Sequence, residues 1–414
     1  MNTPATIDKF VARLMMVSFF VPMQFQPVAV FATALYFIVS TLIAKQTINK
    51  QHIAWAFLLG SSYLLYLFAI PLTPPRFAST IHMLVEYRMS YLLLPIVFSL
   101  ISQEKLRLIY NELAWFVYAL IAVCVAANAA FAIKYLTLPT GFKGVTHVTY
   151  RIYFEEFCGH HPTYVSMYLV LAAGFLLVIG DQMNRAIKYL LFYVILALLL
   201  PLMAKSPLIA LVAVFAHQAW VRRKTLLRYK WVFGGMLLVM IASYVFVPFV
   251  SQRLQEAVHF SGTSSNGNFA GNSVHERKMI LGVDTDMLRH YWLTGVGPAR
   301  LMTELKIHYF FHSLYYGRYV NFFDPHNEYL YQWLSFGLLG IVLFVTTLLT
   351  HLATSIKSRD YLYLYLLFIV FFTFFTESIL TTQHGLIFFS FFASLFFFAR
   401  KSGALTAGAR FYNS

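Results

Sequence analysis

Long apolar runs separated by short polar segments dominate the chain. They lie at residues 11–24, 27–44, 53–70, 87–102, 109–132, 162–180, 187–203, 207–221, 231–249, 328–350, 361–379 and 385–399. A helix that crosses a bilayer needs about 20 predominantly apolar residues. The pattern therefore predicts an all-α polytopic membrane protein with about twelve transmembrane helices.

Two polar segments are too long to be simple turns, at about residues 133–161 and 250–327. We expect residues 1–249 to carry helices one to nine, 250–327 to form a large external loop with amphipathic helices, 328–400 to carry helices ten to twelve, and 401–414 to form a cytoplasmic tail. Within the loop, Ile280, Val283, Met287 and Tyr291 share one helical face, as a helix lying on a membrane surface requires.

Composition excludes several classes of protein. Apolar residues make up 59% of the chain and charged residues only 11%, whereas a soluble domain carries roughly 25% charged residues. A water-soluble globule and a disordered chain are therefore excluded, and two cysteines cannot build a disulfide scaffold. We expect no bridge between Cys124 and Cys158.

The net charge of +15 follows from topology and does not indicate a nucleic-acid partner. With a cytoplasmic N-terminus, 18 of the 31 Lys and Arg residues fall on the cytoplasmic side, and every short loop on that side is basic. Seven of the other 13 lie in the 250–327 segment, and long segments report topology poorly. The distribution predicts that both termini are cytoplasmic.

The segment Asp324-Pro325-His326-Asn327-Glu328 precedes a long apolar run. Asp324 suits a helix N-cap and Pro325 the first helical position, which would put His326 in the first turn. The helix dipole disfavours a positive charge there, so the imidazole is expected to be neutral, as a general base requires. The alternative is a histidine that only caps the helix and packs against lipid headgroups.

Two further helix starts are expected on the same external face. At Lys205-Ser206-Pro207, Ser206 can cap and Pro207 can begin a helix, and a helix N-terminus beside a cation binds anions. The alternative for Lys205 is a lysine that extends to the membrane surface. The other start is His160-His161-Pro162.

The sequence gives no strong metal signature. Glu155 and Glu156 precede the two histidines, but the spacing matches no zinc motif. Asp284 and Asp286 would point about 200° apart on a helix, so shared ligation is not expected. Asp284 does fall on the face of Arg277, two turns on, and could hold that guanidinium. Together, the helix starts and arginines favour an anionic ligand such as a lipid pyrophosphate.

Several motifs together resemble the O-antigen ligase and polymerase superfamily. They run from Arg277 through Gly297 to His326-Asn327-Glu328, and on to Gly337 and Gly340. The runs His161-Pro162-Thr163 and Glu377-Ser378-Ile379-Leu380, with Gln383 and Gly385, are also similar to members of that superfamily. The resemblance covers roughly residues 150–395, and the N-terminal third agrees only in hydropathy.

This resemblance implies a GT-C-type glycosyltransferase of the bacterial inner membrane, with its active site in the periplasm. Such enzymes move a glycan from undecaprenyl pyrophosphate to an acceptor hydroxyl, with inversion and without a metal or other cofactor. The acceptor is lipid A–core in ligases, a second lipid-linked glycan in polymerases and a protein in O-oligosaccharyltransferases. Within the family, a ligase is slightly favoured over a polymerase.

The resemblance also implies roles for individual residues. His326 would deprotonate the acceptor, and Arg277 would bind the pyrophosphate. Ala204-Lys205 stands where the family commonly has Ser-Arg, so Lys205 keeps the charge but loses the bidentate fork. Further expected phosphate contacts are Arg300 and Arg318, and expected supporting residues are Asp324, Asn327, Glu328, Asp284 and His161.

Two other classes of protein are less favoured. Ion-coupled transporters usually keep ionisable residues near the membrane midplane. Of the 16 acidic residues here, only Glu112 and Glu377 fall within the expected spans, both near span ends. A non-enzymatic assembly protein would not need basic helix starts gathered on one face.

Overall fold

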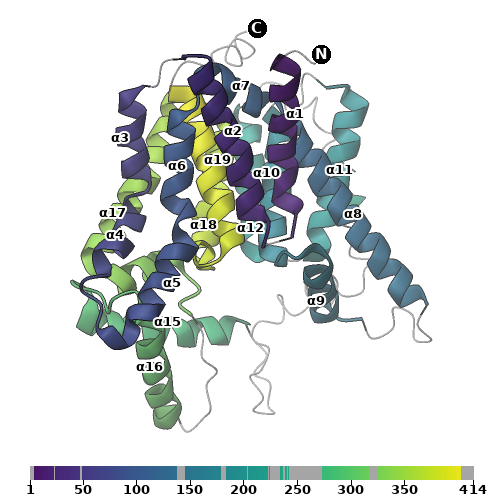
Figure 1. Ribbon diagram of the computed structural model, residues 1–414. Coiled ribbons are helices and arrows are strands. Elements are labelled where there is room, and N and C mark those ends of the chain that lie inside the picture. Colours follow the sequence, from purple (N-terminus) through teal and green to yellow (C-terminus); the bar gives the residue numbers. More distant parts are fainter. Residues whose placement is uncertain are drawn as a thin grey trace. The chain divides into compact units, whose positions relative to one another are not determined.

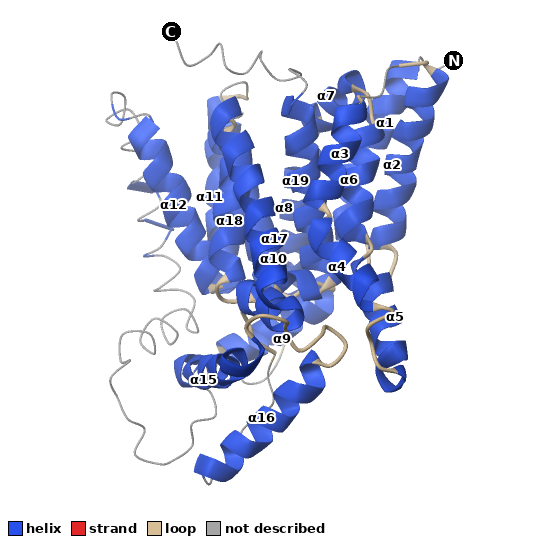
Figure 2. Ribbon diagram, turned by 90° about the vertical axis from the view of Figure 1, so that its left-hand side faces the viewer, coloured by secondary structure: helices blue, strands red, loops and turns tan. Residues whose placement is uncertain are grey.

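The computed structural model of the chain describes residues 4–22, 24–46, 49–137, 145–178, 183–202, 204–221, 223, 234–235, 238–239, 241, 273–316 and 324–401. In these residues the regular structure is helical throughout, without strands (Figures 1 and 2). The expected all-α fold is confirmed.

The helices are α1 Pro4–Val17, α2 Gln26–Ile43, α3 Lys50–Leu59, α4 Ser61–Ala69, α5 Ala78–Arg88, α6 Ser90–Leu100, α7 Gln103–Asn111, α8 Ala114–Leu136, α9 His147–Cys158, α10 Pro162–Val178, α11 Arg185–Leu202, α12 Lys205–Val221, α15 Ser273–Tyr291, α16 Leu301–Tyr316, α17 Glu328–Ser358, α18 Tyr361–Phe374 and α19 Gln383–Lys401. Short 3-10 turns are η1 Ser18–Phe20, η2 Pro75–Phe77 and η5 Ile379–Thr381.

The chain forms two compact units. Unit 1 holds Met1–Phe37, Arg107–Gly262 and Arg359–Phe372, and unit 2 holds Ile38–Leu106, Thr263–Ser358 and Thr373–Ser414.

The described helices are those of a multi-pass membrane protein, and the predicted count of twelve spans is not confirmed by them. Five helical stretches are long and apolar enough to cross a bilayer, or up to seven if each of two bent pairs is one span. The pairs are α3 with α4, bent by 63°, and α9 with α10, bent by 76°. Three shorter apolar helices are α12, α18 and α19. The run expected at 231–249 lies almost entirely outside the described residues.

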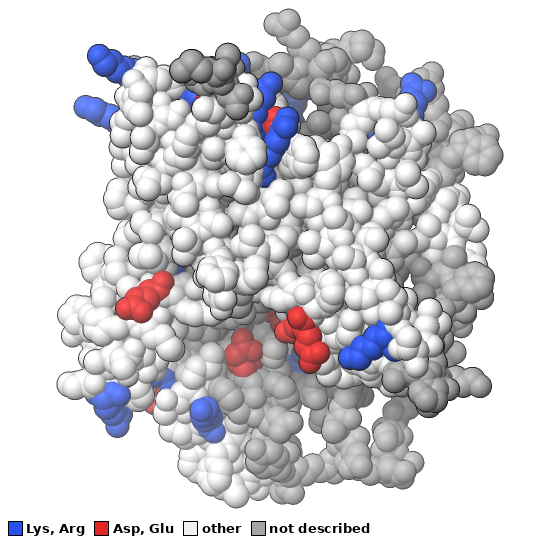
Figure 3. Space-filling view, turned by 45° about the vertical axis from the view of Figure 1, so that its right-hand side comes forward, with Lys and Arg blue, Asp and Glu red and all other residues white. Residues whose placement is uncertain are grey.

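Helix α10 forms the core of unit 1. It is apolar on every side and is buried from Tyr164 to Leu176, as expected of a helix enclosed by others. It packs against α8, α11 and α12. On the face of unit 1 shown in Figure 3, charged side chains lie toward the ends of the helices and the surface between them is almost free of charge. Helix α8 shows the same pattern, with Lys134 in its last turn.

Helix α19 has the corresponding central place in unit 2. Residues Leu386–Ala399 are buried, and the helix packs most extensively against α6 and also against α17. Ring contacts such as Phe98 with Phe391 and His351 with Phe397 fill this core. Hydropathy alone cannot separate this protein-enclosed helix from a lipid-facing one.

Contacts between α3, α17 and α19 show which residues lie at each end of unit 2. His52, near the start of α3, contacts Phe398 near the end of α19, while the backbone N–H of Leu380 is bonded to Glu328 at the start of α17. The basic residues Lys50 and Lys357 therefore lie at the end opposite Glu328. The stretch Leu338–Ser358 of α17 rises about 30 Å, close to the roughly 30 Å hydrocarbon thickness of a bilayer.

A break in α17 at Gly337 accounts for two of the glycines that the sequence singled out, Gly297 and Gly337. Gly337 has φ 65° and ψ −153° inside the helix. The freed carbonyl groups of Leu334 and Ser335 accept hydrogen bonds from the N–H groups of Val296 and Gly297, at 2.8 and 3.1 Å. In return, the N–H of Leu338 donates to the carbonyl of Leu293 at 3.1 Å. These bonds satisfy backbone groups that the break would otherwise leave unpaired.

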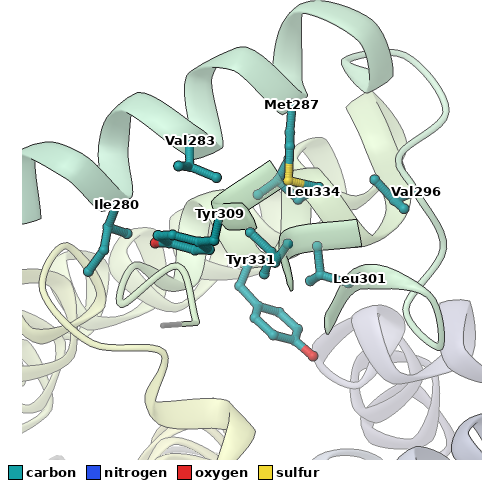
Figure 4. Close-up of a cluster of buried hydrophobic side chains, with 9 residues drawn as sticks. Ile280, Val283, Met287, Val296, Leu301, Tyr309, Tyr331 and Leu334 are labelled. Carbon is teal, nitrogen blue, oxygen red and sulfur yellow. The ribbon is translucent and has the colours of Figure 1, made fainter. Parts of the chain in front are cut away.

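Helix α15 is fixed to this region by an apolar cluster (Figure 4). Ile280, Val283 and Met287 pack with residues of α16 and α17, including Tyr309 and Leu334. Tyr291 lies partly buried against the same cluster. The predicted apolar face is therefore correct, but its expected contact is wrong, because the face packs on protein and not on a membrane surface. Figures 1 and 2 show α15 running crosswise to α17 and α19 at this end of unit 2.

Gly337→Ala is expected to destabilise the protein. A Cβ at this position would lie 2.1 Å from the carbonyl oxygen of Leu293, and positive φ alone costs a non-glycine residue about 1 to 2 kcal/mol. Thermal unfolding of the detergent-purified protein measures the effect. The control is Gly282→Ala in α15, where a Cβ meets nothing within 4 Å and alanine favours the helix by up to about 1 kcal/mol. Equal melting temperatures for the two variants would contradict this account of the break.

Candidate functional site

His326 lies in a turn just before α17. The N-cap is Asn327, whose side-chain oxygen accepts the N–H of Leu330 at 3.1 Å, and the helix begins at Glu328. The prediction that Asp324 caps the helix, with Pro325 and His326 in its first turn, is therefore wrong. His326 has φ 44°, a left-handed backbone conformation that is uncommon for residues other than glycine.

Carboxylates contact both ring nitrogens of His326. Nδ1 lies 3.1 Å from Oε2 of Glu377, and Nε2 lies 3.2 Å from Oδ1 of Asp324. The imidazole is about one-third exposed, at 34%, so it is accessible from outside while held on two sides.

Arg277 joins the same group from α15. Its Nη2 lies 3.5 Å from Oε1 of Glu377, and its side chain is 43% exposed. One carboxylate thus contacts both a guanidinium and an imidazole. The structure brings together Arg277 and His326, the two residues predicted to be catalytic.

The residues after His326 attach the start of α17 to the segment that carries Glu377. The amide of Asn327 donates to the carbonyl of Phe375 at 3.3 Å. The fully buried carboxylate of Glu328 accepts the N–H of Leu380 at 3.0 Å and the amide of Gln332 at 2.8 Å. Asn327 and Glu328, which were expected to support the site, thus join the start of α17 to this segment, and their role in the site stays a prediction.

A buried arginine, Arg88, lies next to the contacts that Glu328 makes. The Arg88 guanidinium is between the rings of Tyr66 and Tyr331, at 4.6 and 4.7 Å from their centroids, and donates to the Tyr331 hydroxyl at 2.9 Å. Its charge acts on the buried carboxylate of Glu328. A buried carboxylate requires such compensation, and Arg88 supplies it to Glu328.

The carboxylates favour the charged form of His326. The hydrogen bond to Glu377 raises the pKa of His326 above its ordinary value; burial and the Arg277 charge oppose this rise, and the Asp324 charge adds to it. The expectation of an imidazole kept neutral by a helix dipole is therefore wrong in direction. The cause is tertiary, because the helix begins two residues later and Glu377 comes from a distant segment.

Asp284 does not hold Arg277, contrary to expectation. Its side chain is fully buried, and neither carboxylate oxygen has a hydrogen-bond partner. Burial, reinforced by the Asp324 charge and opposed by His326, raises the pKa of Asp284 to about 8. Burial also raises the pKa of Asp324. The described ion-pair partner of Arg277 is Glu377.

The other predicted phosphate contacts lie away from His326 or outside the described residues. Arg300 pairs with Glu304 at 2.9 Å at the start of α16, and none of the described contacts joins it to His326 or Arg277. Arg318 lies outside the described residues. Lys205 is an exposed residue of unit 1 and is itself the first residue of α12, so the helix begins before Ser206 and not after it.

His161, also in unit 1, sits at the predicted start of α10. Its Nδ1 accepts the N–H of Thr163 at 3.3 Å, and its Nε2 contacts the Arg151 guanidinium. Pro162 is the first residue of the helix, as expected. Among the described residues, no group of three His, Cys, Asp or Glu side chains is arranged to hold a metal ion.

Two contributors were missing from the predicted site. Glu377 belonged to a motif noted for its family resemblance, yet its contact with His326 spans 51 positions and has no local signal. Arg88 stood at the edge of an apolar run, where an arginine usually marks only a membrane boundary. Its burial between two tyrosines becomes visible only in the folded chain.

Comparison with known proteins supports the resemblance. Residues 190–345 match the family model described as O-antigen ligase. The matched region includes Lys205, Arg277 and the segment from Asp324 to Glu328, and it ends before Glu377. No curated protein sequence matches the chain. The resemblance drawn from the motifs is confirmed over this region.

Glu377→Gln is expected to lower the pKa of His326, because it removes the charged hydrogen-bond partner that is the main cause of the raised pKa. The imidazolium signal in NMR spectra of histidine-labelled protein then disappears at lower pH. The control is Asp286→Asn, which removes an exposed carboxylate of α15 that pairs with Arg289. An unchanged His326 titration in the Gln variant would refute the assigned contact.

Proposed function

We propose that this protein, whose residues 190–345 match the family model described as O-antigen ligase, is a membrane glycosyltransferase that moves a glycan from undecaprenyl pyrophosphate to an acceptor hydroxyl. The proposed acceptor is lipid A–core, and the proposed place is the periplasmic face of the bacterial inner membrane. The observation that carries the proposal is the shared carboxylate of Glu377, which holds His326 and Arg277 in one site.

His326 is the general base in this proposal. Its Nδ1–H donates to Glu377, which fixes the tautomer and leaves the lone pair of Nε2 for the acceptor hydroxyl. The carboxylate also stabilises the imidazolium formed when the proton arrives. This is the role that an acidic partner has for a catalytic histidine in other enzymes. Glu377 acts through His326 and is therefore a positioning residue.

Arg277 binds the leaving pyrophosphate. A guanidinium carries five N–H donors, and the contact with Glu377 at 3.5 Å leaves a 43% exposed side chain able to bind phosphate. Preorganised positive charge stabilises the negative charge that develops as the sugar–phosphate bond breaks. Pyrophosphate is then the leaving group, and inversion follows from direct attack on the opposite face of the sugar.

The orientation of unit 2 supports a periplasmic site. His326 precedes the start of α17, whereas Lys50 and Lys357 lie at the other end of the unit. Basic residues are enriched on the cytoplasmic side of membrane proteins. The proposal therefore puts the end with the short loops of Lys50 and Lys357 in the cytoplasm and the His326 end in the periplasm, because basic residues in long segments such as 250–327 report topology poorly.

A polymerase would use the same donor and the same site with a different acceptor. The pattern of products separates the two activities. In cells lacking the protein, accumulation of full-length lipid-linked polymer indicates a ligase. Loss of long chains while single repeats are still transferred indicates a polymerase.

His326→Ala and Arg277→Ala are each expected to abolish glycan transfer. Loss of a general base costs about 10² to 10⁴ in rate, and loss of an electrostatic donor costs a similar amount. The measurement is the lipopolysaccharide ladder in a strain lacking the native gene and complemented with each variant. Asp286→Asn is the matched control, and all variants are compared at equal membrane abundance. Unchanged ladders in both alanine variants would refute the catalytic assignment.

Lys205→Arg is expected to keep transfer activity, and Lys205→Ala to lose most of it, because we propose that a cation at this helix start binds the donor phosphate. The same complementation assay measures both, and a higher KM for the lipid-linked donor is expected for the alanine variant. Equal activity of the Ala and Arg variants would remove Lys205 from the site.

A further inference from the structure

The contacts of His326 conflict with its role as a base. A neutral imidazole has one N–H and one lone pair. When Nδ1–H donates to Glu377, the lone pair on Nε2 faces the Asp324 carboxylate 3.2 Å away. An ionised carboxylate has no proton to share with a lone pair, so this contact becomes repulsive. An acceptor hydroxyl can reach Nε2 only after Asp324 withdraws.

Asp284 offers Asp324 another partner. It is fully buried in α15, and both of its carboxylate oxygens lack a hydrogen-bond partner. The Asp324 charge acts on it directly, so the two carboxyl groups share one electrostatic environment. A buried, unpaired carboxylate is costly unless it takes up a proton. Burial raises the pKa of Asp284 to about 8, and the protonated group then has an O–H to donate.

Building on the proposed function, we propose that Asp324 exchanges partners during the reaction. It leaves Nε2 of His326 and accepts a hydrogen bond from the protonated carboxyl group of Asp284, which frees Nε2 for the acceptor hydroxyl. Asp284 is therefore a positioning residue that acts through Asp324 and does not touch the substrate.

The exchange also makes His326 a better base. The Asp324 charge is one of the influences that raise the pKa of His326. Withdrawal of that charge favours the neutral imidazole at the moment when Nε2 is exposed. The titratable and charged groups around the two aspartates are Arg277 on α15, Tyr309 on α16, His326, Glu377, and Glu328 and Tyr331 on α17.

The transfer step moves one proton and exchanges one bond at the anomeric carbon. The acceptor hydroxyl gives its proton to Nε2 as its oxygen forms a bond to the anomeric carbon. The bond from that carbon to the pyrophosphate oxygen breaks, and the electron pair leaves with the pyrophosphate. Asp284 donates a hydrogen bond to Asp324 throughout this step and keeps its proton.

Two substitutions test the exchange. Asp284→Asn keeps an N–H donor but cannot ionise, and Asp284→Leu removes the donor. Transfer is measured from pH 6 to 10 with the purified full chain, an undecaprenyl-pyrophosphate-linked glycan and lipid A–core. The control is Asp286→Asn on the same helix, whose carboxylate is 46% exposed and pairs with Arg289.

We expect wild-type activity to fall on the alkaline side as Asp284 ionises, near the pKa of about 8 that burial gives it. The Asn variant keeps its activity there. The Leu variant loses at least about tenfold in kcat with the KM for the donor unchanged. Its melting temperature stays equal or rises, because an apolar side chain replaces an unpaired buried carboxyl.

The inference is overturned if the Leu variant turns over like the wild type, or if the Asn variant keeps the alkaline fall. If the Leu variant does not fold, the pH profile of the Asn variant decides. Failure of the proposed function is distinguishable in the same assay. A wild-type protein without any transfer refutes the glycosyltransferase, whereas an active wild type with unaffected Asp284 variants refutes only the partner exchange.

Discussion

The Glu377 carboxylate, which lies between a guanidinium and an imidazole, is the contact on which the site depends. Without this anion, Arg277 and His326 would present two groups that repel each other whenever the imidazole is protonated. With it, the charge state of His326 is balanced, because Glu377 favours the imidazolium and Arg277 disfavours it. In the proposed reaction His326 is a base that must be neutral before the transfer and charged after it, which requires both influences. The contact also fixes which ring nitrogen would be left for the acceptor hydroxyl in that proposal.

Backbone hydrogen bonds hold the elements that supply this contact. The break at Gly337 exposes carbonyl groups of α17, and the segment around Gly295 and Gly297 binds them. This segment follows α15 directly, so the break sets where α15 lies and therefore where Arg277 points. On the opposite side, Asn327 and Glu328 attach the start of α17 to the segment that carries Glu377. The site is thus built on hydrogen-bonded backbone, which is more rigid than free loops.

Several groups of the site break the rules that hold elsewhere in the fold. His326 has a positive φ, and the buried Asp284 carboxyl has no partner. The arginine at position 88 is buried among aromatic rings. Each feature is costly, and such costs gather where a protein performs chemistry. Close packing of side chains around α15 and α19 contributes compensating stability, which between membrane helices comes from van der Waals contacts and hydrogen bonds.

The sequence by itself determined the helical class, the start of α10 at Pro162 and the apolar face of α15, and it singled out Arg277 and His326, which the fold brings to one carboxylate. These follow from hydrophobic periodicity, local propensity and motifs, which act over a few residues. The sequence did not determine which of two good capping residues, Asp324 or Asn327, begins α17. Nor did it determine the protonation preference of His326 or the partner of Arg277. Tertiary structure decided these, because the deciding atoms come from residues 375–380, about fifty positions from the start of α17 and a hundred from Arg277. Electrostatics acts between groups that are close in space, whatever their separation along the chain.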